Sequence, residues 1–130
     1  MLPDKDKVFE KDEKNHYLVE TVVFDDIVSY LPIKNHSTLQ KAIIKIDIEG
    51  FEPYAFENAT KLFNKVSVEV VFIEWFHLAK QKDIYDKIEN MINFLLSYEL
   101  KPYMPEGKTI LNVKEWTKWP IDVVWKKDGY

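Results

Sequence analysis

An α/β fold with a mostly parallel sheet is predicted from the alternation of strand-like and helix-like segments. Two apolar runs, residues 42–48 and 66–73, have the composition of buried strands. Apolar residues then repeat at helical spacing over residues 51–63 and again over residues 83–98. Strands joined by helices of crossover length favour parallel pairing through right-handed units. We therefore expect a β-α-β-α-β-β order through the main part of the chain.

The amino-terminal part predicts a charged tail, a strand and a short helix. The tail, residues 1–15, is rich in charged side chains, and the folded domain is expected to span residues 16–130. Apolar residues on both faces of residues 17–24 predict a strand. Asp25 is the expected N-cap of the short helix, which Pro32 would end.

Two further strands are predicted towards the carboxyl terminus. Residues 100–104 form a short strand candidate, and residues 106–108 form a turn because they contain a glycine. Residues 121–125 predict the last strand, which the rigid Trp-Pro pair ending at Pro120 would begin.

Composition and charge exclude several functional classes. The net charge is −4, from 18 basic and 22 acidic residues, and no basic run is interleaved with aromatic residues, which disfavours nucleic-acid binding. The absence of cysteine excludes disulfide scaffolds, thiolate zinc sites and cysteine nucleophiles. No apolar stretch reaches the length of a signal peptide core or a membrane span, so we expect no membrane association and, by default, a cytoplasmic location.

Acidic residues follow the first apolar run, where a glycine breaks it. Residues 45–52 read Lys-Ile-Asp-Ile-Glu-Gly-Phe-Glu, and a helical pattern begins directly afterwards. Carboxylates at the carboxyl end of a buried strand, before a glycine turn into a helix, lie where open α/β sheets form their ligand crevice. The second apolar run also ends in a glutamate, Glu74, which we expect at the same edge of the sheet.

This octapeptide resembles the signature of FkbM-type methyltransferases, which use S-adenosylmethionine. Residues 24–28, Phe-Asp-Asp-Ile-Val, resemble the family's Leu-Asp-Asp-Leu segment, and residues 72–75, Phe-Ile-Glu-Trp, look like its strand that ends in glutamate. The resemblance covers about residues 17–76. It implies a Rossmann-like methyltransferase fold whose last strand is antiparallel. The implied reaction is methyl transfer from S-adenosylmethionine to a hydroxyl group of a sugar or another small molecule.

The chain departs from this family in its glycines. The family's fold opens with a glycine-rich loop around the cofactor, whereas the three glycines here, Gly50, Gly107 and Gly129, are too far apart to form one. We therefore expect a partial domain, the carboxyl-terminal half of the fold, which binds S-adenosylmethionine weakly or not at all by itself. The alternative is a non-catalytic interaction module that self-associates through an exposed sheet edge. A third hypothesis is a carboxylate-based hydrolase, which would need a metal.

Asp47 and Glu74 are the candidate catalytic residues. In the enzyme hypothesis, Asp47 lies at the floor of a pocket and binds or deprotonates an acceptor hydroxyl. Alternatively, it caps the following helix or pairs with Lys45. Glu74 either shares this pocket or is a surface residue just past its strand.

Four further residues are candidates for the substrate pocket. Glu49 and Glu52 either line it or stabilise the first turn of the helix. His77 is a possible base or ligand, although a single loop histidine is more often neither. Asp122 would join the site because the resemblance implies an antiparallel last strand that starts at the ligand edge. None of these residues has the spacing of a specific metal site, so no metal is predicted.

Overall fold

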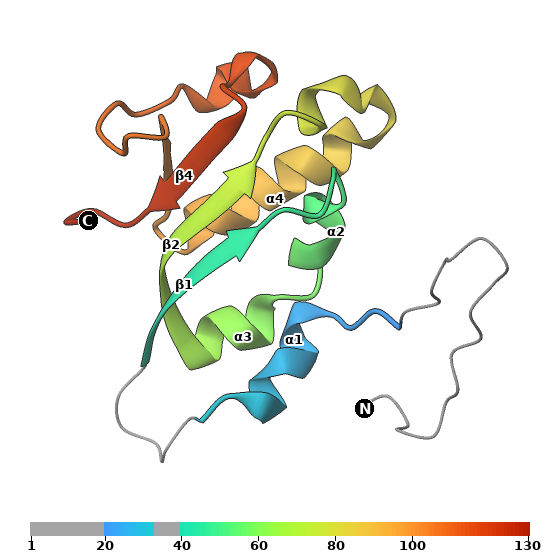
Figure 1. Cartoon of the computed structure of the whole chain (residues 1–130), viewed down its shortest axis with the longest axis vertical. Helices are drawn as coiled ribbons and strands as arrows, with labels where there is room; N and C mark the ends of the chain where they lie inside the picture. Colours follow the sequence, from blue (N-terminus) through green and yellow to red (C-terminus); the bar gives the residue numbers. More distant parts are fainter. Residues whose placement is uncertain (1–19, 33–39) are drawn as a thin grey trace, which may run out of the picture.

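A four-stranded sheet of order β1-β2-β4-β3 forms the centre of the molecule (Figure 1). The computed structural model describes residues 20–32 and 40–130. In this part of the chain the strands lie close to the predicted ones, and they are β1 (Gln40–Ile46), β2 (Val66–Glu74), β3 (Lys101–Tyr103) and β4 (Asp122–Lys126). The predicted tail of residues 1–15 lies outside the described residues.

Helices cover one face of this sheet and form the core with it. Side chains of this face, such as Ile73 and Trp125, are buried together with Phe63 and Ile88 of the helices. No helix of the described residues is long and apolar enough to cross a membrane. The α-helices are α1 (Phe24–Ile27), α2 (Glu52–Phe56), α3 (Thr60–Lys65) and α4 (Tyr85–Ser97), and the 3₁₀ segments are η1 (Val28–Tyr30), η2 (Leu78–Lys80), η3 (Lys82–Ile84) and η4 (Val113–Lys118).

The direction of the strands corrects the expectation of a mostly parallel sheet. Only β1 and β2 form a parallel pair, whereas β4 is antiparallel to both of its neighbours, β2 and β3. The segment between β3 and β4 contains η4 but no α-helix, so it reverses the chain and does not make the helical crossover that parallel strands need. The antiparallel last strand that the family resemblance implies is present.

The amino-terminal prediction of a strand is wrong where it can be compared. Residues 17–19 lie outside the described residues, residues 20–23 form no strand, and Phe24 begins α1. Phe24 packs edge-on against Phe56 of α2, with ring centroids 5.3 Å apart. Tertiary packing of this aromatic ring therefore favours the helix over the strand that the apolar pattern suggests.

The helix predicted over residues 51–63 is divided into two. Residues 57–59 separate α2 from α3, and the backbone oxygen of Asn58 in this break accepts a hydrogen bond of 3.0 Å from Asp25 N–H. The break lets Phe56 and Phe63 both reach the core, where their ring centroids are 6.1 Å apart. One straight helix would not make the contact between the Asn58 oxygen and Asp25 of α1.

The second face of the sheet is less covered by the described residues. Ile43 of β1 and Phe72 of β2 point away from the helical side and are 68% and 43% exposed. Neighbouring residues of this face also include Lys45 and Val124, which lie in register with Phe72. This face leads directly to the acidic strand ends.

Candidate active site

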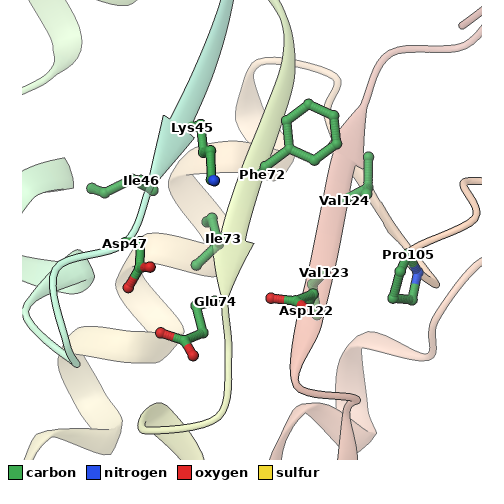
Figure 2. Close-up of a pocket in the computed structure, with 10 residues that line it drawn as sticks. All are labelled: Lys45, Ile46, Asp47, Phe72, Ile73, Glu74, Pro105, Asp122, Val123 and Val124. Carbon is green, nitrogen blue, oxygen red and sulfur yellow. The ribbon is translucent and has the colours of Figure 1, made fainter.

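A pocket of about 470 Å³ lies along this second face, at the carboxyl ends of β1 and β2 (Figure 2). Three carboxyl groups contribute to its wall. Glu74 and Asp122 are register partners on β2 and β4, and Asp47 follows the last residue of β1. The remaining lining residues are Lys45, Ile46, Phe72, Ile73, Pro105, Val123 and Val124.

Asp47 and Glu74 lie side by side in the pocket, as Figure 2 shows. A hydrogen bond to the Asp47 carboxyl raises the pKa of Glu74 above its ordinary value, and partial burial and the negative charge of Asp47 act in the same direction. The charge of Glu49 also raises this pKa, while His77 opposes the shift. The carboxyl groups gathered at this end of the sheet therefore favour the protonated form of Glu74.

The structural roles considered for Asp47 are not found among the described residues. No side chain caps the amino terminus of α2, and Asp47 forms no ion pair with Lys45. Lys45 instead lines the pocket together with Asp47. Asp47 therefore has pocket contacts and no helix-capping contact.

Glu49 is turned away from the line of β1. Glu49 and Gly50 have positive φ angles of 56° and 95°, and Phe51 N–H donates to the Ile48 oxygen at 3.3 Å. Positive φ at both central residues makes this a tight turn of the I′ kind. The turn directs the Glu49 carboxylate to His77, whose Nε2 lies 2.8 Å from Glu49 Oε2, and neither residue lines the pocket.

Glu52 has a structural position beneath the same turn. Its side chain is fully buried, and Oε1 accepts a hydrogen bond of 2.9 Å from Ile48 N–H. It does not line the pocket. Its carboxylate therefore holds the turn that follows β1 and does not face the acceptor site predicted for it.

Gln81 joins the loops that carry Glu49 and His77, and sequence reasoning missed it. Its Nε2 donates to the Gly50 oxygen at 3.0 Å and to the His77 oxygen at 3.4 Å. A Cβ atom on Gly50 would lie 2.4 Å from this nitrogen, so a larger residue would displace the Gln81 amide. No local pattern around Gln81 signals this contact, since its partner Gly50 is distant in the chain.

Sequence patterns indicate some of the other pocket residues and not others. Lys45 and Phe72 stand two positions before Asp47 and Glu74, so strand alternation places them on the same face. Pro105 comes from the segment after β3, and no sequence signal points to it. Trp119, near Asp122 in the sequence, packs against Trp75 with ring centroids 4.7 Å apart and does not line the pocket.

A family model matches most of the chain. The family model of the methyltransferase FkbM domain matches residues 3–101. The match contains Asp47 and Glu74 and ends in β3, before Asp122. Neither a curated protein nor a solved structure matches the chain.

Proposed function

The chain belongs to the methyltransferase FkbM domain family, and from this we propose that it methylates a hydroxyl oxygen of a sugar or another small molecule. One observation carries the choice of oxygen as the acceptor atom. The Asp47 and Glu74 carboxyl groups lie side by side in the pocket at the strand ends, where they can bind a hydroxyl group.

The carboxyl pair offers two hydrogen-bonding groups to the substrate. Asp47 accepts a hydrogen bond from the hydroxyl group to be methylated and takes up its proton as the oxygen becomes nucleophilic. Glu74, beside it, offers a second carboxyl group that can hydrogen-bond to another hydroxyl group of the same molecule. Asp122, opposite Glu74 on β4, can accept from a third hydroxyl group.

The charge of the pocket favours neutral, polyhydroxylated acceptors. Three carboxyl groups and one lysine line it, so an anionic substrate would meet net negative charge. Phe72 and Val124 provide an apolar surface beside these groups, which suits the C–H face of a sugar ring. Neutral glycosides are therefore the expected substrate class.

The described residues do not fit S-adenosylmethionine, the donor that the family implies. Gly50 is packed against Gln81, Gly107 faces the Lys126 side chain, and Gly129 is far from both in the chain. None of them belongs to a glycine-rich cradle in the described residues. We infer that the chain by itself binds this donor weakly.

Acceptor binding provides a test that does not depend on the donor. We expect methyl glycosides to shift the NMR signals of Asp47, Glu74 and Asp122 in the ¹³C-labelled chain. Asp47→Asn should weaken this binding, whereas Glu115→Gln, at an exposed carboxylate on η4, should leave it unchanged. Glycosides that perturb none of the three pocket carboxyl groups would contradict the proposal.

A second candidate is a non-catalytic interaction module that self-associates through β1. The observation in its favour is that β1 stands at the edge of the sheet formed by the described residues, with Ile43 68% exposed. An edge strand offers unpaired backbone groups to a second chain. The oligomeric state of the chain in solution distinguishes this candidate from the enzyme.

A further inference from the structure

Three side chains beside the pocket have the geometry of metal ligands, and we propose that Glu49, Glu74 and His77 bind a divalent transition-metal ion. Each offers one donor atom, and these atoms lie within 4.8 Å of one another. They come from the turn after β1, the end of β2 and the residue before η2. The linear spacing of these residues gives no metal signature, which is why the sequence predicted no metal.

The three donors lie close to the reach of a single ion. Two donors on one zinc ion are at most about 4.2 Å apart, because each lies about 2.0–2.2 Å from the metal. Glu49 Oε2 and His77 Nε2, at 2.8 Å, already satisfy this limit. The Glu74 donor lies within 4.8 Å of the other two, so it exceeds this limit by at most about 0.6 Å, which a side-chain rotation can remove.

The donor types select the class of metal. One imidazole and two carboxylates suit zinc or manganese, whereas magnesium and calcium prefer sites made of oxygen alone. The Glu49 and His77 side chains are 73% and 35% exposed, so solvent or a substrate can occupy the remaining positions on the ion. Three protein ligands with an open position are typical of catalytic metal sites.

The charge around the cluster independently favours a cation. Glu52, fully buried beneath the Glu49 turn, has one carboxylate oxygen without a hydrogen-bond partner among the described residues. Within the same described part of the chain, no lysine forms an ion pair with Asp47, Glu49 or Glu74. A buried carboxylate without a compensating charge is unfavourable, and an ion at the turn would provide that charge.

Gln81 acts as a positioning residue for the proposed ion. By donating to the backbone oxygens of Gly50 and His77, it holds the Glu49 turn against the His77 loop. Outer groups that orient the ligands contribute to metal affinity. The proposed site therefore has a support that is present without the ion.

Calorimetric titration of the full chain, after removal of metals by a chelator, tests the proposal directly. We expect Zn²⁺ or Mn²⁺ to bind with one-to-one stoichiometry, and Ca²⁺ to bind more weakly. His77→Ala and Glu49→Gln should each weaken the affinity at least about 10-fold, since loss of even an outer-shell partner costs about 10–100-fold. This binding requires no methyl donor, so its failure is separate from failure of the proposed reaction.

The two other histidines of the sequence, His16 and His36, provide matched controls. His16→Ala and His36→Ala should bind the ion as the parent chain does, and so should Glu115→Gln. Glu49 is largely exposed, so Glu49→Gln remains informative even if His77→Ala fails to fold. Binding that is absent, or that Glu49→Gln leaves unchanged, would overturn the proposal.

Discussion

The Asp25 carboxylate of α1 caps a different helix, because Leu62 N–H at the start of α3 donates to Asp25 Oδ1 at 2.9 Å. The residue before α3 is Ala59, which has no capping side chain. Asp25 N–H also donates to the Asn58 oxygen, so both of its contacts fix α1 on the break between α2 and α3. Asp25 was expected to cap its own helix, but it caps α3, which is distant in the sequence.

Removal of this cap should destabilise the fold. Asp25→Ala leaves the Leu62 N–H without its acceptor and should lower the free energy of unfolding by about 1 kcal/mol, the usual effect of losing an N-cap. Asp25→Asn keeps an acceptor oxygen and should retain most of the stability. Urea denaturation of the three proteins measures the difference, and an Asp25→Asn protein as unstable as Asp25→Ala would show that the carboxylate acts by charge instead.

Asp47→Asn should reduce methyl transfer while the fold remains intact. The amide keeps the shape of the side chain but cannot take up a proton, and loss of a general base typically lowers the rate by about 10²–10⁴-fold. Glu74→Gln should have a smaller effect. Turnover is measured as release of S-adenosylhomocysteine at millimolar donor with a neutral glycoside acceptor. If Asp47→Asn unfolds the chain and activity per folded molecule is unchanged, its role is structural.

The carboxyl pair should make stability depend on pH. The pKa of Glu74 is raised in the folded chain above its ordinary value of 4.5, mainly by the hydrogen bond to Asp47. The folded chain therefore binds more protons than the unfolded chain between these two values, and its stability falls as the pH rises through that window.

Glu74→Gln removes the titrating group, so the variant should lack the part of the pH dependence of stability that Glu74 causes. The melting temperature of the variant minus that of the parent chain should be higher at pH 7 than at pH 4. Thermal melting at both pH values, with a chelator present, provides the comparison. A difference in melting temperature between variant and parent that is the same at both pH values would contradict the raised pKa of Glu74.

Gly50→Ala should destabilise the turn after β1 more than backbone strain alone explains. An alanine in the left-handed region costs roughly 1–2 kcal/mol, and the new Cβ would also overlap Gln81 Nε2. Gly129→Ala is the matched control, because Gly129 has nearly the same φ, +96° against +95°, with no atom within 4 Å of a Cβ. Equal loss of stability in the two variants, measured by denaturation, would exclude the steric contribution of Gln81.

The edge strand β1 should promote self-association. Ile43 is 68% exposed, and β1 pairs on one side only among the described residues, so we expect oligomers at high protein concentration. Ile43→Lys should shift the chain towards monomer, because a charge on an edge strand opposes pairing. Light scattering measures both proteins, and a monomeric parent chain at high concentration would argue against this interface.

The strong periodic segments were predictable because their signals are local. Strand β2 and helix α4 agree closely with the predicted residues 66–73 and 83–98. Their apolar residues lie within a few positions of one another, and burial of one face is enough to specify the element. The helix of residues 51–63 was predicted as one piece because its division depends on Asp25, far away in the chain.

The sequence by itself determined the family, the main strands and the acidic ends of β1 and β2, since parallel neighbours bring their carboxyl ends to one edge. Only the tertiary structure decided the direction of β4 against its neighbours and which carboxylates face the pocket. It also decided that Glu49 meets His77 and that Glu52 is buried beneath the turn. These outcomes depend on backbone turns and on contacts between residues far apart in the chain, which local patterns of apolar and polar residues do not encode.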